Sequence, residues 1–172
     1  MNKILKKKIK FHRIFRIFFP CLKHLKITKL FLNKSINMNY NETKLRVRYG
    51  ETDQMGVVYH ANYAVYFEVG RTEWLREFGL SYSGMEADGI MLPVISLSIN
   101  YKNSARYDDE LKVKTTLKKM PTASIEFEYE LRNQSDVLLA TGSTILAFVD
   151  AKKNRPTRCP KYLLDQLQNY SL

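Results

Sequence analysis

The clearest pattern in the chain is a strict alternation of apolar side chains with glutamate over residues 125–131. Successive side chains of a strand point to opposite faces, so this pattern predicts a strand with one buried and one solvated face. Four further runs are also strand-like. Turn-forming residues separate the four runs that follow residue 89. The predicted strands cover residues 43–49, 90–102, 110–119, 124–133 and 137–149.

One long helix is predicted between the first and second strands, because apolar residues recur there at steps of three or four. The stripe consists of Tyr63, Phe67, Gly70, Trp74 and Phe78. Asn62 is a suitable N-cap and Gly79 a suitable stop. The solvated face carries Glu68, Arg71, Glu73, Arg76 and Glu77. Glu68 and Arg71 are three residues apart, so they either form an ion pair on the surface or face a partner chain. A short helix from Pro160 completes the order β-α-β-β-β-β-α, which predicts an α+β fold with the long helix on one face of an antiparallel sheet.

The net charge of +11 is confined to the start of the chain. Residues 1–37 carry 11 Lys or Arg and no acid, whereas 17 basic and 17 acidic residues follow from Met38 onward. We therefore expect a basic N-terminal extension (1–37) and one folded domain (38–172). Arg13, Arg16 and Pro20 interrupt any secretory signal. The extension is then a disordered or membrane-surface arm, a transit peptide, or a stretch upstream of a true start at Met38.

The composition of residues 38–172 excludes several classes of protein. This part is neutral and has no basic face with interleaved aromatic residues, so we expect no nucleic-acid partner, and membrane contact only through residues 1–37. Cys21 and Cys159 have no disulfide or zinc spacing, which favours a reducing, cytoplasmic location. His60 is the only histidine after residue 37, so we expect no metal, and no cofactor is indicated.

The segment between the first strand and the helix carries the residues suited to chemistry. Asp53 supplies a carboxylate, Gly56 allows close approach of the backbone, and a helix opens near Asn62. A carboxylate beside free backbone N–H groups suits acyl transfer, because those groups stabilise a tetrahedral oxyanion. A thioester needs no strong general acid, because a thiol leaves readily as thiolate. Asp53 would attack the carbonyl or deprotonate the attacking water, and the sequence leaves both open.

The spacing of this segment resembles the signature of the 4-hydroxybenzoyl-CoA thioesterase family. The matching residues are Arg46-Val47, Thr52-Asp53, Gly56-Val57-Val58, His60 and Tyr63. Residues 66–76 and 101–109 resemble the branch of short acyl-CoA thioesterases associated with the bacterial Tol-Pal system, and the likeness covers about residues 45–150. The resemblance implies a hotdog fold, a five-stranded sheet wrapped around the long helix, with homodimers that share one continuous sheet and assemble into a homotetramer.

The resemblance also implies roles for individual residues. Asp53 would be the catalytic carboxylate, His60 would lie beside the substrate or only position Asp53, and the backbone of Gly56, Val57, Val58 and Tyr59 would lie near the thioester carbonyl.

The remaining site residues are predicted from their chemistry. The phosphates of CoA require basic residues, and the candidates are Arg106, Lys118 and Lys119, with Ser124 on the pantetheine arm. Met91, Leu92 and Val94 are the predicted acyl pocket. The expected activity is hydrolysis of an acyl-CoA to the free acid and CoA. An acyl-carrier-protein thioesterase and a non-catalytic acyl-binding or scaffold protein are the alternatives.

Overall fold

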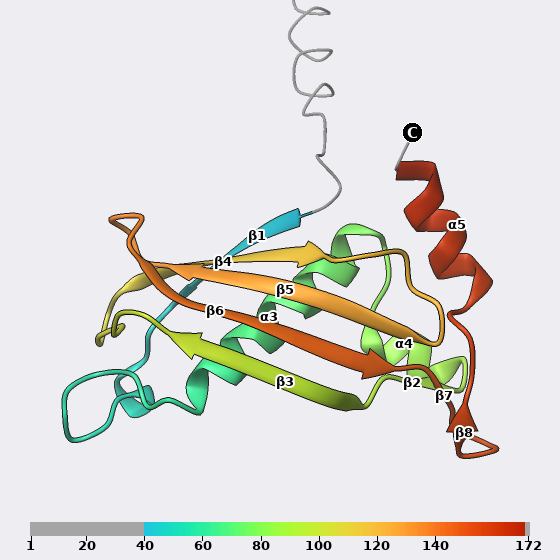
Figure 1. Cartoon of the computed structure of the whole chain (residues 1–172), viewed down its shortest axis with the longest axis horizontal. Helices are drawn as coiled ribbons and strands as arrows, with labels where there is room; N and C mark the ends of the chain where they lie inside the picture. The colour runs from blue at the N-terminus through green and yellow to red at the C-terminus, as the bar shows by residue number, and fades with distance from the viewer. Residues whose placement is uncertain (1–39, 171–172) are drawn as a thin grey trace, which may run out of the picture. The chain divides into compact units, whose positions relative to one another are not determined.

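The computed structural model describes residues 40–170, so the predicted extension at residues 1–37 lies outside the described residues. Its main sheet is antiparallel and has the strand order β1-β4-β5-β6-β3 (Figure 1). The strands are β1 (Tyr40–Arg46), β3 (Val94–Tyr101), β4 (Glu110–Leu117), β5 (Ser124–Arg132) and β6 (Leu138–Ala147). The predicted five-stranded sheet is confirmed. No described helix is long and apolar enough to cross a membrane.

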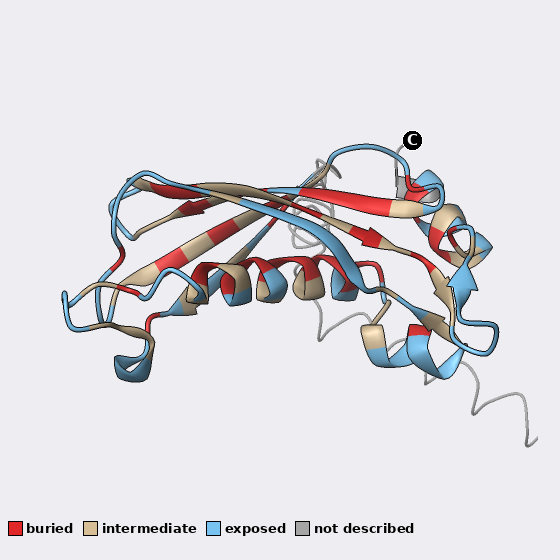
Figure 2. Ribbon diagram, turned by 60° about the horizontal axis from the view of Figure 1, so that its bottom comes forward, coloured by how far each residue is buried: buried red, intermediate tan, exposed pale blue. Residues whose placement is uncertain are grey.

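Helix α3 (Asn62–Glu77) lies against one face of this sheet, and its buried residues face the strands (Figure 2). All five residues of the predicted stripe are buried. They pack on alternate residues of β5, the inward-facing Ile125, Phe127, Tyr129 and Leu131. The Phe67 and Tyr129 rings stack with their centroids 4.5 Å apart, and Trp74 meets Phe127 edge to face. The alternation seen in the sequence is therefore the inward face of the central strand.

Two glycines allow the helix and the sheet to come this close. A Cβ on Gly70 of α3 would lie 2.5 Å from Thr115 Oγ1 and 2.7 Å from Val113 Cγ1, both on β4. A Cβ on Gly142 of β6 would overlap the Phe67 ring and lie 2.7 Å from the Ser98 carbonyl oxygen. At these distances any larger residue would force neighbouring atoms to move, so close packing favours glycine at both contacts.

One residue of the predicted solvated helix face is buried. Arg71 is only 7 % exposed, and its Nε donates to the Tyr82 hydroxyl at 3.1 Å. Its Nη2 forms an ion pair with Glu68 at 3.1 Å. The placement of Arg71 among the solvated residues is wrong, because a buried guanidinium with these two partners keeps its hydrogen bonds without water.

The structure adds short elements that the sequence pattern does not predict. Helix α4 (Tyr82–Ala87) begins after Ser81, whose hydroxyl accepts the Gly84 N–H. The predicted strand over 90–102 is interrupted at residues 92–93, because Pro93 has no N–H to donate. Its first part, β2 (Ile90–Met91), joins β7 (Val149–Asp150) and β8 (Arg155–Pro156) in a second, three-stranded sheet. Helix α5 (Lys161–Tyr170) follows Pro160, as predicted.

Candidate active site

Asp53 lies at the base of a tight turn between the 3-10 helix η1 (Tyr49–Glu51) and α3. Thr52 and Val58 form an antiparallel bridge that closes residues 53–57 into the turn. The Asp53 N–H donates to the Val57 carbonyl at 2.9 Å, and the Gly56 N–H donates to the Asp53 carbonyl at 3.0 Å. Gly56 has a φ of +72°, which few residues other than glycine adopt. Three backbone constraints thus fix the position of Asp53.

The Asp53 carboxylate keeps most of its hydrogen-bonding capacity. Asp53 is partly exposed, and its Oδ1 accepts the Met55 N–H at 2.9 Å. Within residues 40–170 the carboxylate forms no ion pair and no other hydrogen bond. An ionised carboxylate has about four lone-pair sites, so the second oxygen is available to a water molecule or a substrate carbonyl.

The turn is anchored to the end of β3 and the start of α3. Val58 is buried, and its N–H donates to the Ala105 carbonyl at 2.9 Å. The Tyr101 hydroxyl, at the end of β3, donates to the His60 carbonyl at 3.0 Å. The Ala105 N–H donates to the Tyr63 hydroxyl of α3 at 3.2 Å. The turn is therefore held where the end of β3 and the start of α3 meet, in addition to its position after the first strand.

Glu51 organises this turn, although the sequence pattern assigns it no role. Its Oε2 accepts both the Arg48 N–H and the Tyr66 hydroxyl at 2.8 Å. Its carbonyl accepts the Tyr59 N–H at 2.9 Å and the Asn62 side-chain amide at 2.7 Å. Burial and this carboxylate raise the pKa of the Tyr66 hydroxyl. Glu51 has the capping-box position three residues after the N-cap of η1, but Arg48 is that N-cap, so the Ser/Thr-x-x-Glu sequence signature is absent.

The backbone donors near Asp53 are only partly free. The N–H groups of Gly56, Val58 and Tyr59 already donate to carbonyls of the chain. Of the four predicted donors, only Val57 has an N–H that makes no hydrogen bond within residues 40–170. Two further N–H groups, those of His60 and Ala61, are also unbonded within these residues.

Asn62 is the first residue of α3, and Ala61 is its N-cap, so the assignment of Asn62 as N-cap is wrong. The Asn62 side chain instead binds the Glu51 carbonyl.

His60 is exposed and packs against Tyr59, with ring centroids 4.3 Å apart. No hydrogen bond joins it to Asp53. Its predicted role beside the substrate remains a prediction.

The predicted acyl-pocket residues lie at the far end of the main sheet from Asp53 (Figure 1). Met91 is in β2, Leu92 follows it and Val94 begins β3, whereas Tyr101 beside His60 ends β3. Seven residue steps of about 3.3 Å separate Val94 from Tyr101, or about 23 Å. Met91 and Val94 are 37 % and 46 % exposed. One chain therefore does not bring these residues to its own Asp53.

The predicted CoA-binding residues are divided in the same way. Arg106 lies near the Asp53 turn and forms no ion pair within the described residues. Lys118 and Lys119 lie in the β4–β5 turn at the other end, where the Thr122 carbonyl accepts the Cys159 N–H. Their ammonium groups pair with Glu126 at 2.9 and 3.1 Å. Ser124 begins β5 at the same end.

No group of three or more His, Cys, Asp or Glu side chains in residues 40–170 is arranged to hold a metal ion. Burial raises the pKa of the Cys159 thiol to about 12, which makes it a poor ligand or nucleophile near neutral pH. The Asp53 carboxylate and the free backbone N–H groups near it are therefore the candidate reactive groups of the described site.

Several known proteins are similar to this chain. Residues 47–167 match the profile of the Thioesterase-like superfamily. The acyl-CoA thioesterase YbgC of Haemophilus influenzae is 36 % identical over 68 % of this chain and 86 % of that protein. The chloroplastic acyl-acyl carrier protein thioesterase ATL3 of Arabidopsis thaliana is 31 % identical over 76 % of this chain and 69 % of that protein. A DHNA-CoA thioesterase from Staphylococcus aureus has 41 % identity and a TM-score of 0.71, covering 77 % of this chain and 89 % of that one.

The family match over residues 47–167 includes the Asp53 turn, α3 and strands β3 to β6. The chain therefore belongs to the Thioesterase-like superfamily and is a thioester hydrolase with the hotdog fold.

Proposed function

We propose that the protein hydrolyses an acyl-CoA to the free acid and CoA, with Asp53 as the catalytic carboxylate. The observation that carries the proposal is an Asp53 oxygen left unbonded in a rigid turn that also holds the free N–H of Val57. An oxygen–carbon bond forms to the thioester carbonyl, the carbon–sulfur bond breaks, and the sulfur leaves as thiolate. The proton released from the attacking water passes to the thiolate or to solvent, through Asp53 where Asp53 acts as base, and the Asp53 carboxylate is restored.

Asp53 acts as nucleophile or as general base in this reaction. As nucleophile it forms a mixed anhydride that water then opens; as base it takes the proton of the attacking water directly. The N–H of Val57, with those of His60 and Ala61, stabilises the oxyanion in either case. Gly56, Val58 and Tyr59 hold the turn, and the His60 side chain lies beside the substrate.

We further propose that two copies pair through the free edges of β3. Strands β1 and β3 are the two edges of the sheet, and they differ in character. Three charged residues of β1, Glu42, Lys44 and Arg46, protect its edge. Strand β3 (VISLSINY) has no charge, and Val94, Ile95 and Leu97 are 46 %, 62 % and 45 % exposed. Such an uncharged, apolar edge is a template for pairing with a second strand, and two-fold pairing would make it antiparallel.

This pairing would complete the acyl pocket. In an antiparallel pair of β3 strands, the start of one lies beside the end of the other. The Met91, Leu92 and Val94 end of one copy would then approach the Tyr101 and His60 end of its partner. The acyl group would lie between the Asp53 turn of one chain and the apolar residues of the other. Assembly into a homotetramer and a cytoplasmic location are part of the proposal.

A narrower placement, in the branch of short acyl-CoA thioesterases associated with the Tol-Pal system, is supported by residues 66–76 and 101–109. An acyl-carrier-protein substrate is the second candidate, because ATL3 is named for that activity. Both substrates present the same thioester on a pantetheine arm. Assay of matched acyl-CoA and acyl-carrier-protein substrates separates them.

The test of catalysis compares thiol release from a panel of acyl-CoAs by the full chain, Asp53→Asn and Asp165→Asn. Asp165 is an exposed aspartate on α5 and serves as the matched control. We expect Asp53→Asn to lose at least about a hundredfold in kcat and Asp165→Asn to keep full activity. Activity retained in Asp53→Asn would refute the role of Asp53, and no thiol release by the unaltered protein would refute the CoA substrate.

The test of pairing places a charge on each edge of the sheet in turn. Leu97→Lys puts an ammonium group on the β3 edge, where pairing would bury it, and Thr43→Lys puts one on the β1 edge as control. We expect sedimentation velocity to show a smaller assembly for Leu97→Lys alone, with hydrolysis lost in parallel. Equal assembly of both variants would show that β3 is not the interface.

A further inference from the structure

The free N–H groups at the start of α3 differ in what holds their peptide groups. The N–H and the carbonyl of a trans peptide bond lie in the same plane and point in opposite directions, so a hydrogen bond to the carbonyl also fixes the direction of the N–H. The His60 N–H shares a peptide bond with the Tyr59 carbonyl, which accepts the Asn62 N–H at 2.9 Å. The Ala61 N–H shares a peptide bond with the His60 carbonyl, which accepts the Tyr101 hydroxyl at 3.0 Å. The direction of the Ala61 N–H therefore depends on a side chain from the end of β3.

Tyr101 is the closer of the two donors to the His60 carbonyl. Within the described residues the other donor is the Tyr63 N–H at 3.4 Å, which is longer than the usual N–H···O distance of about 2.7–3.2 Å. An accepted hydrogen bond also polarises the peptide group, which strengthens its N–H as a donor. Without the Tyr101 hydroxyl, the His60 carbonyl would keep only the long bond. The Ala61 N–H would then be held less firmly and would be a weaker donor.

The Tyr101 ring is held by a buried residue of α3. Its edge-to-face contact with Tyr63 places the ring centroids 5.1 Å apart, which is a favoured geometry for two aromatic rings. Tyr63 is only 3 % exposed, and its hydroxyl accepts the Ala105 N–H at 3.2 Å. Burial and this hydrogen bond fix Tyr63, and Tyr63 in turn positions the ring that carries the Tyr101 hydroxyl.

The backbone that follows Tyr101 is bonded to the start of β6. The N–H groups of Lys102 and Asn103 donate to the Leu139 carbonyl at 2.8 and 3.0 Å. The side-chain amide of Asn103 donates to the Leu138 carbonyl at 2.8 Å. The end of β3 is therefore fixed to the first residues of β6.

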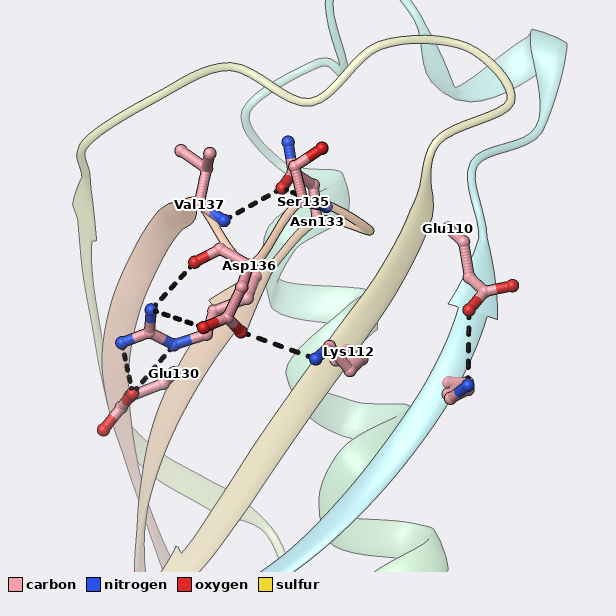
Figure 3. Close-up of polar contacts among 9 residues, drawn as sticks. Glu110, Lys112, Glu130, Asn133, Ser135, Asp136 and Val137 are labelled. Atoms are coloured by element: carbon pink, nitrogen blue, oxygen red, sulfur yellow. Dashed lines mark hydrogen bonds and ion pairs between the residues drawn. The ribbon is translucent and has the colours of Figure 1, made fainter.

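The turn that precedes β6 has its own network of contacts (Figure 3). The side-chain carbonyl of Asn133 accepts the N–H groups of Ser135 and Val137 at 3.1 and 3.0 Å. Asp136 of the same turn forms an ion pair with Lys112 of β4 at 3.4 Å. These contacts hold the start of β6 in place, and through it the backbone that carries the Tyr101 side chain.

We propose that the Tyr101 hydroxyl is a positioning group for thioester hydrolysis: it holds the peptide between His60 and Ala61 so that the Ala61 N–H is directed at the oxyanion. This inference rests on the proposed function. Tyr101 acts through the backbone and touches neither the substrate nor Asp53. The negative charge on the carbonyl oxygen develops fully only as the thioester is attacked, so a poorly directed donor lowers kcat more than it lowers affinity for the substrate.

The first test compares Tyr101→Phe with Tyr107→Phe in the full chain. Phenylalanine keeps the ring that packs on Tyr63 and removes only the hydroxyl. Tyr107 is 57 % exposed, and its hydroxyl forms no hydrogen bond within the described residues, so Tyr107→Phe is the matched control. We expect Tyr101→Phe to lower kcat for an acyl-CoA about three- to tenfold with KM changed less than about twofold, and Tyr107→Phe to change neither. An unchanged kcat, or a raised KM with kcat intact, would overturn the proposal.

The stretching frequency of the bound thioester carbonyl measures its hydrogen-bond donors directly. Asp53→Asn should bind an acyl-CoA without hydrolysing it, so the infrared band of an isotope-labelled carbonyl can be recorded in the site. Hydrogen bonds to a carbonyl lower this frequency. Asp53→Asn/Tyr101→Phe should therefore show the band at higher frequency than Asp53→Asn, and Asp53→Asn/Tyr107→Phe should show it unmoved. A purely structural role of Tyr101 would lower Tm and leave the band in place, which would refute the positioning role.

A fluorinated tyrosine at position 101 tests the same hydrogen bond in the opposite direction. It keeps the aromatic ring and the hydroxyl, and its more acidic hydroxyl is a stronger donor. The carbonyl band should then move to lower frequency, with kcat equal to or above that of the unaltered chain. This result does not depend on whether Tyr101→Phe folds, and a band that moves to higher frequency would contradict the proposal.

The outcome for the unaltered chain separates failure of this inference from failure of the proposed function. If the unaltered protein hydrolyses an acyl-CoA and Tyr101→Phe hydrolyses it equally well, only the role of Tyr101 is wrong. If the unaltered protein hydrolyses no acyl-CoA, the proposed substrate itself is wrong, and this inference falls with it.

Discussion

Gly142→Ala tests how closely the sheet is packed against the helix that carries the active site. Gly142 pairs with Tyr129 of β5 on one side and Ile99 of β3 on the other. An added methyl group would overlap the Phe67 ring and lie 2.7 Å from the Ser98 carbonyl oxygen, where ordinary contacts between carbon atoms are about 3.5–4.0 Å. Phe67 cannot move away freely, because its other neighbour is the stacked Tyr129 ring.

The expected loss of stability is the difference between two terms. Overpacking a core costs about 1–3 kcal/mol, whereas alanine in a strand is favoured over glycine by roughly 0.5–1 kcal/mol. The net destabilisation is then about 1–2 kcal/mol. At roughly 3–5 °C per kcal/mol for a domain of this size, Tm should fall by about 3–10 °C.

Differential scanning calorimetry of Gly142→Ala, Gly50→Ala and the unaltered chain measures this effect. A methyl group on Gly50 would meet no atom within 4 Å, and Gly50 has no positive φ, so its alanine variant should match or slightly exceed the unaltered Tm. Phe67→Leu in the Gly142→Ala background should recover part of the loss, with a coupling above about 0.5 kcal/mol. An unchanged or raised Tm for Gly142→Ala would refute the close packing of β6 against α3.

Three further predictions concern groups around the site and the core. Glu51→Ala should cost about 2–3 kcal/mol, because it removes the acceptor of two hydrogen bonds, and Glu51→Gln should recover part of that; urea unfolding measures both. Arg71→Met should lower stability by about 1–3 kcal/mol in the same assay, because Tyr82 and Glu68 lose their buried partner. Burial raises the pKa of the Cys159 thiol to about 12. In the unfolded state the thiol loses its proton near pH 8.5, whereas the folded state keeps it. The free energy of unfolding therefore falls as the pH rises between these two values. Between pH 8 and pH 10 the free energy of unfolding should fall by about 1–2 kcal/mol less in Cys159→Ala than in the unaltered chain. An equal fall in both proteins would contradict the raised pKa.

The elements predicted correctly from the sequence are those with one buried face over a long run. The stripe from Tyr63 to Phe78 and the alternation over residues 125–131 both continue long enough for their period to be read. Helix α4 has six residues and strand β8 two, which is too short for any period to emerge. Arg71 shows a second limit, since its burial depends on Tyr82 of another helix. A charged residue in a helix gives no local sign of such a partner.

The motif identifies the Asp53 turn but only some of the residues that position it. Gly56 is part of the motif, and its positive φ is the reason why glycine stands there. Glu51 escapes prediction because two of its partners, Asn62 and Tyr66, lie 11 and 15 residues away on α3. Contacts over that distance depend on how α3 turns back over η1. The sequence periodicity of η1 and α3 does not predict how these two helices are oriented relative to each other.

The division of the predicted site between two ends of the sheet follows from the order of the strands alone. Consecutive antiparallel strands place successive turns at opposite ends, so the breaks at 104–109 and 120–122 cannot lie together. Arg106 belongs to the first break and Lys118 precedes the second, which means that one chain never offers both to one CoA molecule. The proposed second copy, turned by a two-fold axis beside β3, would bring the start of one β3 strand beside the end of the other.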